Sequence, residues 1–269
     1  MSYWDTFESR WEITADLVAE TGLRVGAGGE ASMPTATDLP VLKDARGHPF
    51  IPGSSLRGVL RSHIERIVRT LEPQAGNGRG ACMVGVETCI PERAGGEEGG
   101  TDERGKAKQI WTRSCRVCRV FGNARLASRV RIADLPLIAT EAASFVEIRD
   151  GVAIDREKET VIHKYDFEAV PTGARFRLSI VADNLDPAER GLLWLGLLEM
   201  QRGHIHLGGF KGRGLGRVTL ENVNLRLVEA SNRAALRAYL LEGTMPSVLE
   251  ATADGWMESL MDELLNGGA

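Results

Sequence analysis

Apolar and polar positions alternate along several stretches of the chain, which is the pattern of strands that bury one face. From Trp11 to Leu17 the alternation predicts a strand over residues 11–23. Three later stretches are also interpreted as strands: residues 130–138, 175–181 and 217–227.

Two other stretches repeat apolar residues at helical spacing. The first follows Pro52, where Ser54 or Ser55 is available as an N-cap. Its apolar face is formed by Leu56, Val59, Leu60, His63, Ile64, Ile67, Val68 and Leu71. The second begins at Asp186-Pro187 and runs to Met200, and further helical segments end the chain.

The predicted order is therefore β, α, β, β, α, β, which is the order of the ferredoxin-like motif. We predict an α+β fold in which two helices cover one face of a four-stranded antiparallel sheet. The 269 residues are enough to bury a core and are interpreted as one elaborated domain, residues 1–269. Residues 73–108, rich in glycine and charge, predict a flexible insertion, and residues 144–171 form a second, polar one.

The chain has no apolar run of membrane-spanning length, and its start, Met1-Ser2-Tyr3-Trp4-Asp5, lacks the layout of a secretory signal. We therefore expect a cytoplasmic protein without membrane contact. In that reducing compartment, cysteines are expected to bind metals more often than to form disulfides.

All four cysteines fall within 37 positions, as Cys82-x6-Cys89, 25 further residues, and Cys115-x2-Cys118. Two local pairs of thiolates suit tetrahedral zinc, although the first spacing is wider than usual. Four protein ligands leave no open position for water. The cysteines therefore predict a structural zinc knuckle.

Charge is distributed unevenly. The whole chain has a net charge of −4 and a pI of about 5.8, which argues weakly against nucleic acid. Residues 104–131 nevertheless contain nine Lys or Arg and no Asp or Glu, whereas acidic residues prevail beyond Val228. The central segment predicts a phosphate-binding surface, with Arg125, Arg129 and Arg131 as candidates.

Residues 207–217 hold five glycines and three cations. Their glycines let the backbone approach a ligand, and Lys211 and Arg213 supply charge. The segment matches neither a P-loop nor a dinucleotide fingerprint, so an ordinary glycine-rich connection remains open. The same holds for Ser54, Ser55, Arg57 and Arg61, which could bind phosphate at a helix N-terminus or simply lie on a solvated face.

Loop residue Asp38 is, from local sequence, an ordinary turn or solvated carboxylate. The histidines show neither metal nor triad spacing, and we assign them no chemistry: His48, His63, His163, His204 and His206.

In combination, these stretches resemble the RAMP superfamily, specifically the repeated backbone subunit of type III CRISPR effector complexes. The similarity follows the family's order through residues 22–28, 37–44, 49–61, 115–122 and 207–218. Its most specific part is Ile51-Pro52-Gly53-Ser54-Ser55-Leu56-Arg57-Gly58 followed by the distal glycine loop.

The resemblance implies an RNA-recognition-type (RRM-like), ferredoxin-like palm with a thumb hairpin within residues 144–171. A finger-like insertion at residues 73–128 would carry the zinc knuckle, which only some family members have. Residues 229–269 would form a C-terminal helical segment.

The resemblance also implies that copies stack along a CRISPR guide RNA and hold its phosphates with the first helix and the glycine loop. Here these roles fall on Ser54, Ser55, Arg57, Arg61, Gly209, Lys211, Gly212 and Arg213. Ile154 of the thumb, with Val152, would wedge between bases. The implied partners are guide RNA, complementary target RNA, further copies or related subunits, and other type III effector subunits.

Asp38 aligns with the family's loop aspartate, so the resemblance implies a Mg²⁺-dependent, RNA-guided endoribonuclease that cuts target RNA at regular intervals. Two alternatives within the superfamily remain. One is an RNA-binding scaffold that does not cut, and the other is a guide-processing RNase that uses His or Tyr as acid and base. An unrelated zinc-ribbon protein is the outside possibility.

Overall fold

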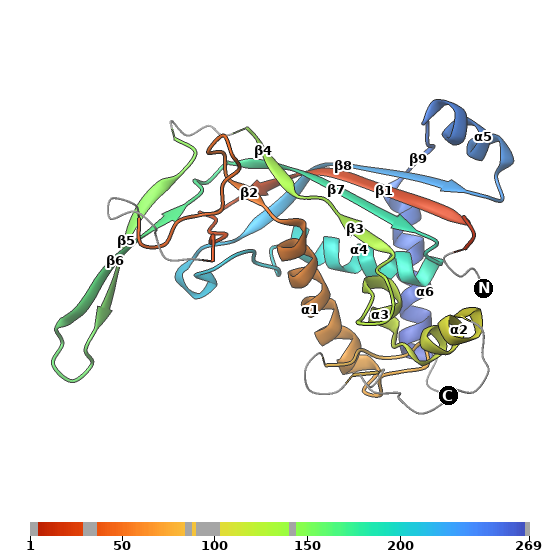
Figure 1. Ribbon diagram of the computed structural model, residues 1–269, viewed down its shortest axis with the longest axis horizontal. Coiled ribbons are helices and arrows are strands. Elements are labelled where there is room, and N and C mark those ends of the chain that lie inside the picture. The colour runs from red at the N-terminus through yellow and green to blue at the C-terminus, as the bar shows by residue number, and fades with distance from the viewer. Residues whose placement is uncertain (1–4, 29–36, 84–87, 90–102, 140–143, 267–269) are drawn as a thin grey trace.

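The computed structural model describes residues 5–28, 37–83, 88–89, 103–139 and 144–266. An antiparallel sheet forms its centre, with the strand order β2-β4-β7-β1-β8-β9 and β3 paired to β7 (Figure 1). The strands are β1 (Ser9–Ala19), β2 (Phe50–Ile51), β3 (Val130–Ile132), β4 (Leu135–Ala139), β7 (Arg175–Asp183), β8 (Val218–Glu229) and β9 (Ser247–Val248). The central strand β1 thus contacts β7 and β8, which come much later in the chain.

The alternation seen in the sequence becomes the two faces of this sheet. Trp11, Ile13 and Leu17 of β1 are buried, whereas Thr14 between them is exposed. Ile13 lies opposite both Ile180 and Leu225, so the apolar face continues across three strands. The stretch 130–138, predicted as one strand, is divided into β3 and β4 at Ala133 and Asp134.

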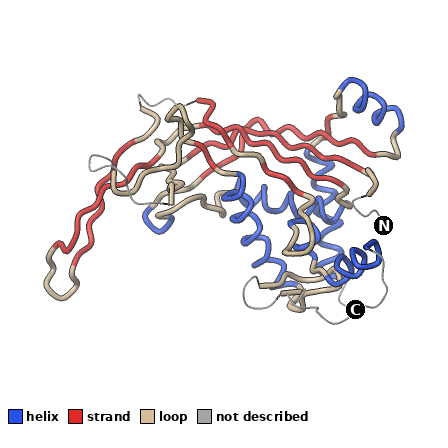
Figure 2. Tube along the Cα trace, in the orientation of Figure 1, coloured by secondary structure: helices blue, strands red, loops and turns tan. Residues whose placement is uncertain are grey.

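Three helices lie on the apolar face: α1 (Gly53–Leu71), α4 (Pro187–Gln201) and α6 (Glu250–Asn266) (Figures 1 and 2). The prediction of a four-stranded sheet with two helices is therefore incomplete, because β2 and β9 extend the sheet, the stretch 130–138 gives two strands and α6 is a third helix. The predicted apolar stripe of α1 is confirmed, because Leu56, Leu60 and Ile64 are fully buried. Helix α4 starts with a capping box between Asp186 and Glu189. It is buried almost all round because it packs between the sheet, α1 and α6.

The start of α1 differs from the prediction. Neither serine caps it: the N-cap residue is Pro52, which has no side-chain cap. Asp134, from the break between β3 and β4, accepts a hydrogen bond from Gly53 N at 2.8 Å instead. A Cβ at Gly53 would lie 2.2 Å from Ile132 O, so only glycine permits this close approach.

Two insertions leave this body. The hairpin of β5 (Glu147–Ile154) and β6 (Val161–Ala169) is a separate two-stranded sheet that projects from one end, within the segment predicted as a thumb (Figure 1). Helix α3 (Arg116–Phe121), which follows α2 (Glu103–Arg113) in the chain, lies alongside α1. The prediction of a flexible stretch over residues 73–108 is wrong for residues 103–108, which belong to α2. Residues 84–87 and 90–102 lie outside the described residues.

The C-terminal segment is helical, as expected, with α5 (Arg233–Glu242) followed by α6. Helix α6 buries Ala253, Trp256 and Leu260 against the core, so this acidic segment packs on its own fold. Within the described part of the chain, no helix has both the length and the apolar character needed to cross a bilayer.

Candidate active site and metal centre

Asp38 lies against the thumb strand β6. Its backbone N donates to Asp166 Oδ1 at 2.7 Å, and its own Oδ2 accepts from Asp166 N at 3.1 Å. The next residue, Leu39, forms a parallel bridge with Phe167. Asp38 itself is exposed. The structure therefore places an accessible carboxylate at the base of the hairpin, on an anchored loop.

The anchoring continues along the same edge of β6 through Glu168. Its Oε2 accepts from Val41 N at 3.0 Å, and its Oε1 pairs with Lys43 Nζ at 2.7 Å. Glu168 is 8% exposed, so its carboxylate is shielded from water, whereas the Lys43 side chain is partly exposed. The loop from Asp38 to Lys43 is thus docked on β6 by backbone and by two carboxylates.

A small apolar cluster joins this loop to the glycine loop. Phe167, Ala169 and Leu215 form its buried part, with Leu39, Tyr165 and Phe210 packed around it. Arg213 donates to the Tyr165 hydroxyl, and its guanidinium lies 4.7 Å from the centre of the Phe210 ring. Three segments far apart in the sequence therefore meet at the base of the thumb.

One close backbone contact, between Gly208 and Arg24, determines the course of the glycine loop (residues 207–217). Gly208 has φ +75°, and a Cβ there would lie 2.1 Å from Arg24 O. The next amide, Gly209 N, donates to that same oxygen at 2.7 Å, so it already has a partner within the protein. Lys211, Gly212 and Arg213 form a short, exposed 3-10 turn, η1.

A cavity of about 230 Å³ lies between α1 and this loop. Its lining is rich in cationic and titratable side chains: Val59, Ser62, His63, Arg66, His204, Ile205, His206 and Lys211. Behind it, Glu199 Oε2 lies 3.2 Å from His63 Nε2 and 3.0 Å from His204 Nδ1. Burial raises the pKa of Glu199, but hydrogen bonds from His204, His63 and Arg202 outweigh it and hold that pKa below its usual value.

The other candidates on α1 face a different neighbour. Ser54 and Ser55 lie in the first turn of the helix, Ser54 exposed and Ser55 half-buried. Arg57 donates to Phe121 O, and Arg61 donates to Gly122 O at 2.9 Å and pairs with Glu65 at 2.7 Å. Both arginines therefore bind the C-terminal end of α3, where cations are favourable.

The three basic candidates after α3 differ in exposure. Arg129 is buried and bonds Arg119 O, Asn184 O and the carboxylate of Glu189. Arg131 is exposed and pairs with Asp183 at 2.6 Å. Arg125 is exposed as well. Arg129 would have to leave three partners to reach a phosphate.

The thumb presents several apolar side chains to solvent. Ile154 is 57% exposed and Val152 is 49% exposed on β5, and Val161 and Ile162 are exposed on β6. Several solvent-exposed apolar side chains on one hairpin are typical of a contact surface.

The four cysteine Sγ atoms all lie within 4.8 Å of one another. Cys115 also caps α3, because its Sγ accepts a hydrogen bond from Cys118 N at 3.5 Å. Hydrogen bonds with the neighbouring thiols, that of Cys115 first, lower the pKa of Cys82 and raise that of Cys118. The pKa of Cys89 is lowered as well, whereas that of Cys115 is raised, so thiolates at all four positions are disfavoured unless a cation shares the site. The cluster could bind a metal, and four thiolates suit a tetrahedral ion.

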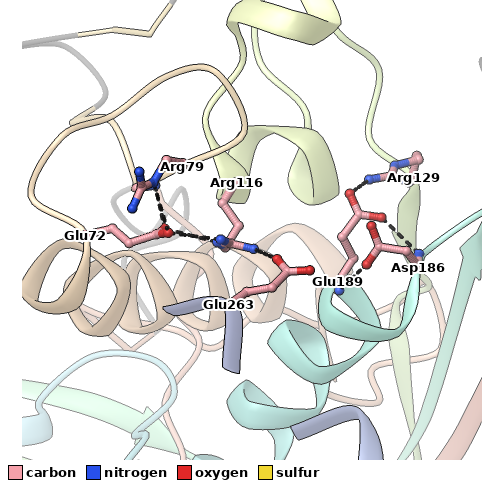
Figure 3. Close-up of polar contacts among 8 residues, drawn as sticks. Glu72, Arg79, Arg116, Arg129, Asp186, Glu189 and Glu263 are labelled. Carbon is pink, nitrogen blue, oxygen red and sulfur yellow. Dashed lines mark hydrogen bonds and ion pairs between the residues drawn. The ribbon is translucent and has the colours of Figure 1, made fainter. Parts of the chain in front are cut away.

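Arg116, the residue after Cys115, connects the start of α3 with the end of α1 and with α6 (Figure 3). Arg116 is 8% exposed and binds Glu72 just beyond α1 and Glu263 on α6. Burial raises the pKa of Glu72, yet the hydrogen bonds and charge of Arg116 hold it below its usual value. In the same view, Arg129 points toward Glu189 at the start of α4.

Sequence reasoning missed several residues that the fold brings to these sites. Asp166 and Glu168 carry no motif and lie well over a hundred positions from their loop partners. His63, His204 and Arg66 were given no role, because the cavity between them requires α1 and the glycine loop to be adjacent.

Comparisons with known proteins agree with this picture. The family model of the RAMP superfamily matches residues 16–219. The CRISPR system Cms endoribonuclease Csm3 of Methanocaldococcus jannaschii is 28% identical over 221 residues, 77% of this chain and 76% of that protein. Its namesake in Methanothermobacter thermautotrophicus is 24% identical over 253 residues, 82% and 87% of the two chains.

A shorter similarity, 42% identity over 62 residues, links the chain to Csm3 of Mycobacterium tuberculosis, covering 23% of this chain and 26% of that protein. The mixed α/β architecture with its antiparallel sheet is consistent with the RAMP fold. The resemblance to backbone subunits of type III complexes is thereby confirmed, and the chain belongs to the RAMP superfamily.

Proposed function

We propose that this protein is a guide-RNA-binding backbone subunit of a type III CRISPR ribonucleoprotein, and that it cuts complementary target RNA through Asp38. The observation that supports this most is the position of Asp38, exposed at the base of the thumb and held to β6. Relatives that match most of the chain bear the name endoribonuclease.

The proposed reaction is attack of a target-RNA 2′-hydroxyl on its adjacent phosphodiester. The new P–O2′ bond gives a 2′,3′-cyclic phosphate, while the P–O5′ bond breaks and the departing 5′-oxygen takes a proton from water to leave as a hydroxyl. Asp38 would accept the hydroxyl proton or help hold a divalent cation. The exposed Asp38 carboxylate is an oxygen donor of the kind that Mg²⁺ prefers, so this residue fits such an ion. When bound, Mg²⁺ would neutralise charge at the scissile phosphate.

The thumb would expose that phosphodiester. Ile154 and Val152 are suited to wedge between bases, because they are apolar and largely in water. Unstacking one nucleotide frees its backbone to reach in-line geometry, and much of the rate would come from this positioning.

Guide phosphates would lie along α1 and the glycine loop. Lys211 lines the cavity with Arg66, and Arg213 extends the cationic surface toward the thumb. Base pairing with the guide would supply sequence specificity, so the protein needs to recognise only the backbone. Arg57 and Arg61 would contribute chiefly by holding the cysteine cluster against α1.

Structural zinc is the metal we assign to Cys82, Cys89, Cys115 and Cys118. We further propose that the 269 residues act as one RAMP-type domain in the cytoplasm, and that copies assemble into a filament with other type III subunits.

One observation favours the alternative of a guide-processing RNase. His63 and His204 share Glu199 beside a cationic cavity, which is a possible acid–base arrangement. Cleavage through these histidines would persist in EDTA and be lost in His204→Ala.

The test is a denaturing gel of labelled complementary RNA with guide-loaded complex and Mg²⁺. Wild type, Asp38→Ala and an EDTA control run side by side. We expect a ladder of evenly spaced products that Asp38→Ala reduces by about a hundredfold or more while RNA binding persists. Intact target with tight binding in wild type would indicate the scaffold alternative.

A further inference from the structure

We propose that Asp166 is a positioning residue for Asp38, so that the thumb strand sets the geometry of the cleavage loop. This inference rests on the proposed role of Asp38. It adds that this role depends on a side chain 128 positions away, on the element that would enter the RNA.

Two reciprocal hydrogen bonds join Asp166 and Asp38. Asp166 Oδ1 accepts from the Asp38 amide at 2.7 Å, and the Asp166 amide donates to Asp38 Oδ2 at 3.1 Å. The second bond orients the Asp38 carboxylate itself, with one of its two oxygens engaged. The first fixes the backbone that carries it.

The loop after Asp38 also runs parallel to β6. Leu39 bridges Phe167 in parallel, and Glu168 N donates to Leu39 O at 3.1 Å. The loop therefore follows the edge of β6 that β5 does not occupy. A shift of the hairpin would carry Asp38 with it, because loop and strand share these bonds.

The position of Asp166 in the hairpin is unfavourable for the pairing of β5 with β6. Asp166 lies directly opposite Asp150 in the hairpin, and like charges in that position destabilise a strand pair. Lys164 lies 3.4 Å from Asp150 and offsets part of the repulsion. The hydrogen bond to the Asp38 amide gives Asp166 a function that hairpin stability alone does not require.

The experiment compares Asp166→Ala and Asp166→Asn in the guide-loaded complex, with Asp150→Asn as matched control. Asp150 carries the same charge on the same hairpin, and it pairs with Lys164 rather than with the loop. Three quantities are measured: the single-turnover cleavage rate with Mg²⁺, the affinity for complementary RNA, and hydrogen exchange of the peptide that contains Asp38.

We expect Asp166→Ala to slow cleavage roughly tenfold or more, because small displacements of a reacting group are costly. RNA affinity should stay unchanged, and the Asp38 amide should exchange faster. Asp166→Asn should behave like wild type in both cleavage and exchange, since its amide oxygen still accepts from the Asp38 amide.

Two results would overturn the inference. Asp166→Asn as slow as Asp166→Ala would mean that the charge matters rather than the hydrogen bond. If Asp166→Ala cleaves at the wild-type rate while Asp38→Ala is inactive, the positioning role of Asp166 is refuted and the catalytic role of Asp38 stands. Cleavage that persists in Asp38→Ala would instead refute the proposed function, and this role with it.

Discussion

Arg116 binds both carboxylate oxygens of Glu72, with Nε 3.0 Å from Oε2 and Nη2 2.9 Å from Oε1. This fork-like pair joins the start of α3, beside the cysteine cluster, to the end of α1. Both side chains are buried, so this ion pair offsets much of the free-energy cost of removing the two charges from water.

Removal of either partner should therefore destabilise the fold. We expect Arg116→Ala to lower the free energy of unfolding by about 3–5 kcal/mol, because buried Glu72 then keeps only the longer 3.7 Å contact to the cation of Arg79. Glu72→Ala should cost less, because Arg116 still pairs with Glu263. Urea unfolding followed by circular dichroism measures this. Arg79→Ala is the control, since Arg79 is half exposed and lies 3.7 Å from the same carboxylate. Equal losses in Arg79→Ala and Arg116→Ala would contradict the argument.

The same pair predicts how stability depends on pH. The pKa of Glu72 is lower in the folded protein than its ordinary value of 4.5. Its contribution is therefore complete above that value and is lost as pH falls through the folded pKa. Wild type should lose stability in acid more steeply than Glu72→Gln, whereas at neutral pH wild type should be the more stable protein. Parallel stability curves for the two proteins below pH 4.5 would refute this.

Removal of the metal should destabilise α3 and the segments that carry the cysteines. We expect the purified protein to contain one zinc per chain, and Cys115→Ser to lose it with a fall in Tm of roughly 10 °C. Elemental analysis and thermal unfolding with and without EDTA check this. A protein that binds no zinc and keeps its Tm in Cys115→Ser would show that the thiols act only as core residues.

The cavity between α1 and the glycine loop should supply phosphate contacts. Lys211→Ala and Arg66→Ala should each weaken guide-RNA binding and reduce the slope of log affinity against log salt by about 0.7–0.9. Arg202→Ala is the matched control, because Arg202 pairs with Glu199 but does not line the cavity. A salt slope unchanged by Lys211→Ala would exclude its phosphate contact.

Cleavage itself should depend on the thumb as well as on Asp38. Ile154→Ala should reduce target cutting more than target binding, because wedging serves the geometry of the phosphodiester. Ile148→Ala, on the same strand and 64% exposed, provides a comparison closer to the hairpin base. Equal effects on binding and on cutting would contradict a wedging role.

The sequence by itself determined the long central elements and their order: β1, α1, β7, α4 and β8. Alternation in β1 and the apolar stripe of α1 are local patterns, so both were predicted within a few residues. The cysteines were predicted to cluster because two close pairs need little chain to meet, and their sulfurs do lie together. The family motifs near Pro52 and Gly208 could also be recognised in the sequence, because proline and glycine restrict or permit particular backbone conformations.

Only the tertiary structure decided which side chains share a site. The backbone N–H of Gly53 at the start of α1 donates to Asp134 rather than to a serine, because the break between β3 and β4 lies beside this end of the helix. Asp166 reaches Asp38, and His204 reaches Glu199 beside α1, only after strands distant in sequence have paired. Such contacts leave no local periodicity, since they depend on loop closure and packing over the whole chain. Arg57 and Arg61 show the same limit, because their positions on the helix did not reveal that α3 would receive them.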